Sequence, residues 1–317
     1  MESASRRYHP ILSILLTIVF VFAGFNLIGP FIGFFIAAPF YDGTMAEMFA
    51  VLQHPTDDPG IRTTLMILQA CGTFFGLIVV PWTLLRKQGV PLSDFFSQRL
   101  YLQPVILIVF IIVMFIIADS VIAVWNQNID FPDWMSGFEK WARASEDTMT
   151  ELTKFVTQFD SFGAMVLGLL VIAILPAIGE EIVFRGLIQN DLFRATRNIH
   201  VAIWTSAIIF SAFHLQFFGF FPRMLLGALF GYMYYWSGSL LMPVIAHFIN
   251  NGLIVVSLYL YQRGVITVDM ESNEAAPWSA VISSTVMLGL LIYFYRKFYA
   301  ENPPAHPLEQ PRQTDGW

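Results

Sequence analysis

The sequence has few charged residues for its length. Asp, Glu, Lys and Arg make up 13% of the 317 residues, whereas hydrophobic residues make up 56%. An average soluble domain carries about 25% charged residues, and the mean hydropathy of this chain is +0.63. The composition therefore excludes an ordinary soluble domain and indicates a polytopic membrane protein.

The chain also lacks several features that would point to other classes. Its one cysteine, Cys71, lies in an apolar run, so no internal disulfide can form. We find no tandem repeat, phosphate-binding glycine loop, paired CxxC motif or basic patch interleaved with aromatic residues. We therefore expect no nucleic-acid partner. The net charge of -6 says little about partners, because the charges lie mostly in loops and tails.

Long apolar runs are what the sequence has in abundance. About 20 apolar residues span a bilayer, and hydrogen-bond satisfaction in lipid requires helices where the polarity does not alternate. The sequence therefore predicts an all-α, polytopic integral membrane helical bundle of about eight transmembrane helices, in contact with the lipid bilayer. The predicted spans are 11–38, 63–85, 101–125, 162–190, 197–217, 220–237, 240–262 and 277–295.

Basic residues near the predicted span ends indicate the orientation, because cytoplasmic loops are enriched in Lys and Arg. They fall on one side if both termini are cytoplasmic: Arg6, Arg7, Arg86, Lys87, Arg99, Arg194, Arg197, Arg296 and Lys297. Arg223 and Arg263 depart from this rule. We expect a multi-pass protein with cytoplasmic N- and C-termini, and the compact loops favour a prokaryotic cell membrane.

The predicted spans divide the chain into four parts. Residues 1–160 contain the N-terminal membrane helices and an outer segment, 133–160, whose apolar positions recur at three- and four-residue intervals. This spacing predicts an amphipathic helix that lies on the interface or caps the bundle. Residues 161–262 form a core of membrane helices that carries the charged motifs described below, and 263–298 contain the last membrane helix. Residues 299–317 are proline-rich and polar, so we expect a disordered cytoplasmic tail.

The first cluster of charges inside the apolar runs is GEEIVFRG at residues 179–186. Residues four apart share a helical face, so Glu181 and Arg185 can pair as a structural strut, while Glu180 has no local partner. Pro176 removes a backbone hydrogen bond and can kink this helix. An unpaired carboxylate shielded from water is a candidate general base. The alternative is a charge cluster at the membrane–water boundary.

Two further clusters follow on later helices. In FSAFH, Phe210 lies four residues before His214 and can orient its imidazole; the alternative is a core histidine satisfied by a carbonyl. In HFINN, His247 and Asn251 present two hydrogen-bond donors on one face, as a developing oxyanion requires. The alternative is polar contact between membrane helices. Glu180 and His214 can meet only if the fourth helix continues to about Asp191.

The ordered motifs EExxxR, FxxxH and HxxxN resemble those of the type II CAAX prenyl endopeptidases and the wider CPBP (ABI) family of intramembrane proteases. The resemblance covers roughly residues 160–260. It implies an all-helical membrane core with a water-accessible cavity in which a peptide bond is hydrolysed. The substrate would be a membrane-associated protein or peptide, lipidated or not, and the motifs do not define which.

Carried over to this sequence, the resemblance implies catalytic roles for four residues. Glu180 would activate water with the help of His214, and His247 and Asn251 would stabilise the oxyanion. Glu181, Arg185 and Phe210 would support the site. No cofactor is then required. Zinc held by Glu180, His214 and His247 is the alternative, but the chain lacks an HExxH pair that would place two histidines on one helical face.

The residues are also compatible with two other classes of function. A proton-coupled membrane transporter would use buried Glu and His side chains as a relay, although matching inverted halves are not evident in the sequence. A catalytically silent membrane scaffold would have the same fold, although such relatives typically lose the Glu or a His. Cleavage assays on peptides discriminate these classes from an endopeptidase.

Overall fold

The structure is a computed structural model that describes residues 7–267 and 274–304. Within these ranges every regular element is helical, which confirms the predicted all-α class. The α-helices are α1 (Pro10–Ala23), α2 (Gly29–Ala37), α3 (Met45–Val51), α4 (Arg62–Gly72), α5 (Val80–Lys87), α6 (Leu102–Gln127), α7 (Ser136–Val156), α8 (Phe162–Gly168), α9 (Leu175–Glu181), α10 (Asn190–Thr196), α11 (Ile199–Ala212), α12 (Phe220–Ser237), α13 (Leu241–Gln262) and α14 (Trp278–Glu301).

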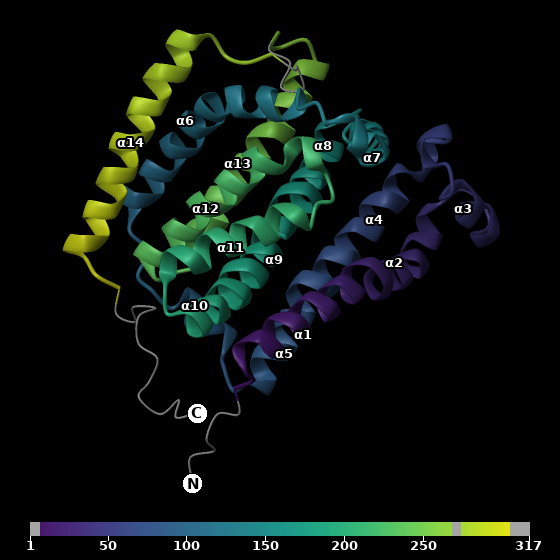
Figure 1. Cartoon of the computed structure of the whole chain (residues 1–317). Helices are drawn as coiled ribbons and strands as arrows, with labels where there is room; N and C mark the ends of the chain where they lie inside the picture. Colours follow the sequence, from purple (N-terminus) through teal and green to yellow (C-terminus); the bar gives the residue numbers. More distant parts are fainter. Residues whose placement is uncertain (1–6, 268–273, 305–317) are drawn as a thin grey trace.

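The helices form three groups that lie side by side (Figure 1). The first group contains α1, α2, α4 and α5, and the third contains α6 and α14. Between them lie the continuous stretch from α8 to α10 and the helices α11, α12 and α13. Because α9 packs on the first group and α13 packs on α6, the middle group is covered on both sides. The candidate catalytic residues all belong to this middle group.

Six helical stretches are long and apolar enough to cross a membrane. They are Pro10–Phe40, Pro59–Lys87, Leu102–Gln127, Phe162–Thr196, Leu241–Gln262 and Trp278–Glu301. The other two predicted spans also form helices, but α11 has only 14 residues. At about 1.5 Å per residue it is about 21 Å long, shorter than the roughly 30 Å hydrocarbon core. The neighbouring α12 has 18 residues and packs along α11.

Three of the spans contain a π-helical segment that ends two residues before a proline. The pairs are η1 (Gly24–Ile28) with Pro30, η5 (Thr73–Val79) with Pro81, and η8 (Leu169–Ile174) with Pro176. Proline has no N–H and its ring crowds the carbonyl four residues earlier. A local π adjustment relieves this conflict while keeping the surrounding backbone hydrogen-bonded, as lipid requires.

Small residues bring the first two spans together. A Cβ added to Gly29 would lie 2.5 Å from the Cα of Gly72, and one added to Gly76 would lie 2.5 Å from the backbone nitrogen of Phe25. Both contacts are too short for any larger residue. The two spans therefore pack backbone against backbone, as small residues allow in membrane helices.

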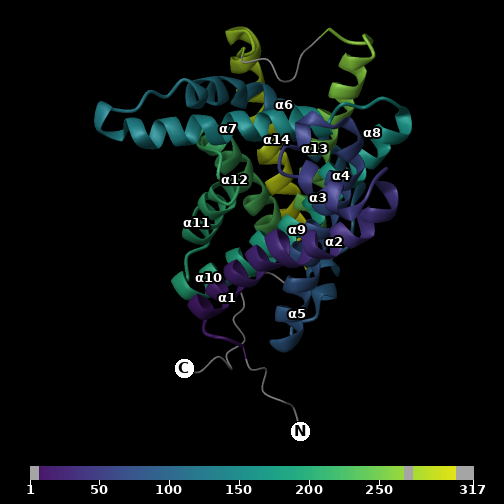
Figure 2. The ribbon, with the colours of Figure 1, turned by 90° about the vertical axis from the view of Figure 1, so that its right-hand side faces the viewer.

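Helix α7 is the predicted amphipathic helix, and it runs across the ends of the membrane helices (Figure 2). It packs on the segment η10 (Phe217–Gly219) that connects α11 with α12. The Phe138 and Phe217 rings are 5.8 Å apart, and the Arg143 guanidinium lies 4.4 Å from the centre of the Phe218 ring. The helix thus caps the bundle, one of the two predicted placements.

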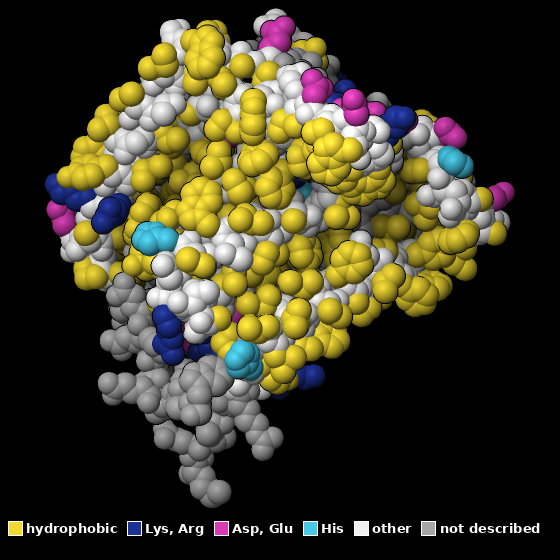
Figure 3. Space-filling view, viewed as in Figure 1, with side chains coloured by type: hydrophobic (Ala, Val, Ile, Leu, Met, Phe, Trp, Pro, Cys, Tyr) yellow, Lys and Arg dark blue, Asp and Glu magenta, His cyan; other side chains and the backbone are white. Residues whose placement is uncertain are grey.

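Charged side chains gather at the two ends of the helices, and the face between them is predominantly hydrophobic (Figure 3). Basic residues lie near the ends of α5, α10 and α14 that point toward the same side of the bundle, the lower side in Figure 1. This arrangement agrees with the rule used for the orientation, which itself stays a prediction. Helix α14 ends at Glu301, three residues past the predicted boundary, and the predicted tail from residue 305 onward lies outside the described residues.

Candidate active site

The fourth membrane stretch positions the two glutamates. Helix continues without a break from Phe162 to Thr196, past the Asp191 that a meeting of Glu180 with His214 requires. The chain then turns at Arg197, whose φ of 56° is left-handed. Asn198 caps α11 by accepting from two backbone N–H groups. The fourth helix thus covers the predicted span 162–190 and meets the condition set for an approach of Glu180 to His214.

Glu181 and Arg185 form the predicted strut. Nη1 of Arg185 donates to Oε1 of Glu181 at 2.8 Å, and the two side chains keep only 1% and 0% exposure. Nη2 of Arg185 donates to the backbone carbonyl of Gly227 at 2.7 Å. The guanidinium also lies over the rings of Phe210 and Phe230, at 4.8 and 5.4 Å from their centres. The buried charge is thus paired, hydrogen-bonded and packed, which is what makes such a pair tolerable.

His247 lies between the two glutamates. Its Nδ1 is 2.9 Å from Oε1 of Glu181, and its Nε2 is 3.8 Å from Oε2 of Glu180. A carboxylate that is already ion-paired only accepts, so Nδ1 carries the proton and Nε2 faces Glu180. The Phe230 ring stacks on the imidazole at 5.1 Å. The sequence analysis missed this use of Glu181 because 66 residues separate it from His247 and no local spacing indicates the contact.

Glu180 is the carboxylate that stays uncommitted. Its side chain is 17% exposed, and Oε2 is buried with no hydrogen-bond partner from the protein. No described residue of its own helix pairs with it, as the sequence predicted. The carboxylate is thus held near His247 at a distance that leaves both groups able to bind another molecule.

His214 lies just past the end of α11, at the turn toward η10. The helix ends at Ala212, whereas the predicted span continued to residue 217. Nδ1 of His214 donates to the carbonyl of Phe210 at 3.0 Å, and the two rings are 5.2 Å apart. The next residue, Leu215, has a φ of 55°, a strained value for a leucine that marks the sharp turn. Both predicted alternatives hold: the Phe210 ring packs on the imidazole, and its carbonyl satisfies one nitrogen.

His214 and Glu180 approach the same region but are not joined by a hydrogen bond within the described residues. His214 interacts electrostatically with His247, which is itself next to Glu180. Because Nδ1 of His214 is used, Nε2 is the nitrogen left to contact a bound molecule. The structure therefore brings the three predicted ionisable residues into one neighbourhood of the middle group.

Asn251 is committed to a backbone contact. Its Nδ2 donates to the carbonyl of Ile172 at 3.4 Å, and its Oδ1 accepts from Asn250 at 3.1 Å. Ile172 lies four residues before Pro176, so its carbonyl is the one that proline leaves without an α-helical donor. Asn251 thus joins α13 to η8, as the alternative of polar contact between helices predicted. An amide has a second hydrogen, which stays available.

The structure also tests whether the histidines and acids are placed to hold a metal. Across residues 7–267 and 274–304, no group of three His, Cys, Asp or Glu side chains has that arrangement. Glu180, His214 and His247 thus do not form a three-ligand group among the described residues.

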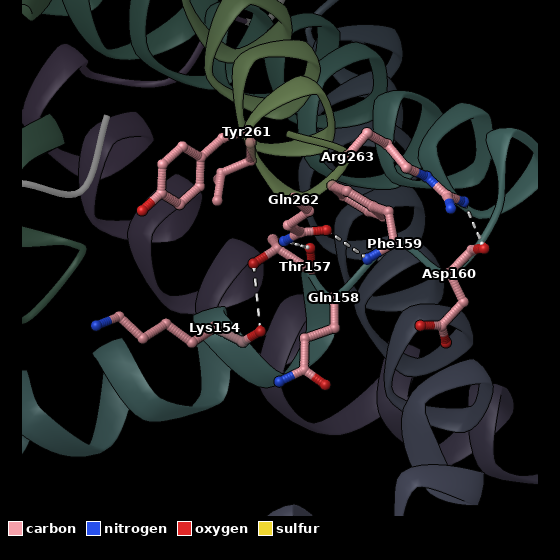
Figure 4. A pocket seen from close by; sticks show the side chains of 9 residues that line it. Lys154, Thr157, Gln158, Phe159, Asp160, Tyr261, Gln262 and Arg263 are labelled. Atoms are coloured by element: carbon pink, nitrogen blue, oxygen red, sulfur yellow. Dashed lines mark hydrogen bonds between the residues drawn. The ribbon is translucent and has the colours of Figure 1, made fainter. Parts of the chain in front are cut away.

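A pocket of about 550 Å³ lies apart from this cluster, where the segment between α7 and α8 meets the end of α13 (Figure 4). Gln262 lines the pocket and hydrogen-bonds to the segment between α7 and α8. Its Oε1 accepts from the N–H of Phe159, and its Nε2 donates to the carbonyl of Thr157, both at 2.9 Å. Arg263 donates to the carbonyl of Asp160 at 2.6 Å. These contacts tie the far end of α13 to the start of α8, which explains Arg263, one of the two cations that departed from the orientation rule.

Comparisons with known proteins cover the same part of the chain. The model of a family described as type II CAAX prenyl endopeptidase Rce1-like matches residues 162–253. The uncharacterized protein YpbD of Bacillus subtilis is 33% identical over 86 residues, which cover 26% of this chain and 41% of that protein. The membrane-embedded CAAX protease MroQ of Staphylococcus aureus is 32% identical over 91 residues, 27% of this chain and 36% of that protein. No solved structure matches.

The matched segment extends from the start of α8 into α13 and contains every residue of the cluster. The matches span about two fifths of the length of these curated relatives. The first three membrane spans, α7 and α14 lie outside the matched segment. Residues 162–253, which contain Glu180, His214 and His247, are thus similar to the Rce1-like type II CAAX prenyl endopeptidases.

Proposed function

We propose that this protein is an intramembrane endopeptidase that hydrolyses a peptide bond of a membrane-associated protein or peptide. The observation that carries the proposal is the buried Oε2 of Glu180, which has no hydrogen-bond partner from the protein and lies 3.8 Å from His247. A carboxylate without a protein partner is free to accept a hydrogen bond from a water molecule and to deprotonate it. The match of residues 162–253 to the Rce1-like family supports this reaction over the transporter and scaffold alternatives.

In the proposed reaction, Glu180 is the general base and His214 helps to hold the attacking water through Nε2. The water oxygen bonds to the scissile carbonyl carbon while its proton passes to Glu180. When the tetrahedral intermediate collapses, the same proton passes to the leaving amine. Glu181 and Arg185 fix His247, so they act as positioning residues rather than as catalytic ones.

His247 and Asn251 are the proposed donors to the oxyanion. Nδ1 of His247 is already bonded to Glu181, so Nε2 is the nitrogen that faces the substrate. It donates to the oxyanion when both ring nitrogens carry a proton. Asn251 can donate its second amide hydrogen while the first stays on the carbonyl of Ile172. One side chain would then both complete the kinked fourth helix and contribute to catalysis.

The substrate class follows from the setting of the site. Glu180 and His247 lie on helices that cross the membrane, so the scissile bond must enter the bundle. A peptide anchored at the membrane, by lipidation or by its own apolar residues, meets this requirement more readily than a freely soluble protein. MroQ is named a membrane-embedded CAAX protease, and we extend to this chain the peptidase activity but no particular substrate.

The test is a cleavage assay on purified protein with matched pools of prenylated and unprenylated fluorogenic peptides. The parent should cleave a subset of the peptides and the Glu180→Gln variant none, with equal folded yield. Cleavage by Glu180→Gln at the parental rate would refute the assigned base. The same assay after chelator treatment addresses zinc, since full activity after metal removal would exclude a catalytic metal.

A further inference from the structure

Arg223 lies on the face of α12 that meets the candidate active site. Gly227, four residues later, accepts from Arg185, and Phe230, seven residues later, stacks on His247. Positions separated by four and seven residues share one helical face. Long side chains on a helix also point toward its N-terminus. The guanidinium of Arg223 is therefore one turn beyond the Glu181–Arg185 pair, on the side of His214.

The contacts of Arg223 agree with this placement. Its Nη2 donates to Oε1 of Gln216 at 3.0 Å, and Gln216 is two residues after His214. Its charge also interacts with Glu180, with His214, and with Glu146 on α7. The cation thus lies between the proposed base and the helix that caps the bundle.

The backbone around η10, next to this guanidinium, is fixed by hydrogen bonds to other helices. On α6, Asn126 donates to the carbonyl of Phe217 at 3.1 Å and accepts from the N–H of Phe221 at 2.9 Å. Ser211 donates to the carbonyl of Phe220 at 2.6 Å. A Cβ added to Gly219 would lie 2.9 Å from Nη2 of Arg223, so a glycine is needed there to leave the guanidinium in place.

One nitrogen of this fixed guanidinium is unused. Nη1 of Arg223 is buried and has no hydrogen-bond partner from the protein. A buried charged donor without a partner is costly, and a fold keeps one when a bound molecule completes it. The two donors already proposed each have one hydrogen engaged, since Nδ1 of His247 is bonded to Glu181 and Nδ2 of Asn251 to Ile172, and each can give at most one more to a substrate. Arg223 adds a cationic donor to these two.

We propose that Nη1 of Arg223 donates to the carbonyl oxygen of the scissile peptide bond and stabilises the oxyanion that develops there. This inference rests on the proposed endopeptidase function. As the water attacks, its proton passes to Glu180 and the carbonyl π electrons move to the carbonyl oxygen. One negative charge thereby disappears from Glu180 and one appears on the substrate, both near Arg223. The transition state thus needs no new counter-charge, which is how preorganised electrostatics lowers a barrier.

Kinetics on the peptide that the parent cleaves fastest give the first test. Loss of an oxyanion donor costs about 10²- to 10³-fold in kcat, so Arg223→Gln should lose that much, with KM changed by less than about threefold. Arg223→Lys keeps the charge and should retain part of the activity. Gly219→Ala leaves the charge intact but displaces the guanidinium. Its kcat should fall between those of Arg223→Gln and Arg223→Lys. Arg263→Gln, a cation in the separate pocket, is the matched control and should keep parental kcat.

Binding to a catalytically inactive variant gives a test that does not depend on turnover. In the Glu180→Gln background, we compare the same peptide with its analogue carrying a negatively charged phosphinate at the scissile bond. The phosphinate should bind at least about tenfold more tightly, and the added Arg223→Gln change should lower this preference severalfold, with the remainder due to His247 and Asn251. An unchanged preference, or a parental kcat in Arg223→Gln, overturns the role of Arg223 while leaving the endopeptidase function intact. If the parent cleaves no peptide and Glu180→Gln binds none, the proposed function and this inference both fail.

Discussion

The outer helices and the inner helices differ in where their apolar residues point. Those of α6 and α14 face mostly outward, whereas those of α9 and α13 pack within the protein. In the most apolar stretch of α6 only 17% of the residues are buried within the protein, whereas in α13 the share is 50%. The polar residues follow the second pattern, since Glu181, His247 and Asn250 are all buried in the inner group. In a membrane the most apolar helix is thus the one that faces lipid, and the interior is where polar side chains find partners.

The two groups also differ in what they do with a carboxylate. Asp119 on α6 has a buried Oδ1 without a hydrogen-bond partner, and no ion pair involves it within the described residues. Glu180 has the same kind of uncommitted oxygen but lies 3.8 Å from His247 and interacts with Arg223. A lone buried acid is therefore insufficient to indicate a site. The surrounding histidines and arginines distinguish the inner carboxylate from the outer one.

The largest expected effect separates these two carboxylates directly. Glu180→Gln should lower kcat by at least about 10²- to 10⁴-fold because it removes the general base. Asp119→Asn, an equally conservative change on α6, should leave kcat within about twofold of the parent. Both rates are measured on the same peptide in the same detergent. Equal losses of kcat in the two variants would contradict the assignment of Glu180 as the base, because any buried carboxylate of the bundle would then have the same effect.

The buried Glu181–Arg185 pair should contribute strongly to the stability of the inner group. No charged residue of the outer helices is expected to contribute as much. Arg185→Ala leaves Glu181 buried without its cation, which should cost about 3 to 5 kcal/mol of unfolding free energy. Arg296→Ala on the exposed face of α14 should change it by less than about 0.5 kcal/mol. Folded yield and denaturant-induced unfolding in mixed micelles measure both. A fully stable Arg185→Ala variant would contradict the strut interpretation.

The contact between Asn251 and Ile172 allows the structural and catalytic roles of one side chain to be separated. Asn251→Ala removes the hydrogen bond to the carbonyl of Ile172 and should cost about 0.5 to 1.5 kcal/mol. Pro176→Ala returns a backbone N–H four residues after Ile172, so the double variant should recover most of that stability.

Activity is the second measurement on this pair. If Asn251 also donates to the oxyanion, the double variant should be stable and yet slow, with kcat reduced by about 10²-fold or more. Recovery of both stability and kcat in the double variant would assign Asn251 to helix contact alone.

The smallest expected effect concerns α3, outside the three helix groups. The backbone N–H and hydroxyl of Thr44 hydrogen-bond to the Glu47 carboxylate and hold its pKa below the usual value of 4.5. A lowered folded-state pKa stabilises the cap above the unfolded pKa, and this contribution is lost as pH falls through the folded one. Hydrogen exchange should show faster opening of α3 in Glu47→Gln at pH 7. The difference from the parent should shrink as pH falls below 4.5 and vanish once the Glu47 carboxylate is protonated in the folded state, with the inner helices unaffected.

Local spacing in the sequence was sufficient wherever the interaction lies within one helix or its turn. The four-residue spacings correctly gave the Glu181–Arg185 pair and the contact of Phe210 with His214. The apolar periodicity at 133–160 gave α7. Hydropathy was less informative about length, because α11 is too short to cross the bilayer by itself. Its end at Ala212 depends on the turn into η10, which is fixed by Asn126 on the distant α6.

The sequence by itself determined the membrane class, the positions of the apolar helices and which ionisable residues were candidates, because composition and periodicity are local properties. Only the tertiary structure decided that Glu181 serves both Arg185 and His247, that Asn251 reaches the carbonyl freed by Pro176, and that Arg223 lies beside the proposed base. Apart from the Glu181–Arg185 pair, these contacts join residues 43 to 79 positions apart, and helix packing in lipid, rather than any local preference, brings them together.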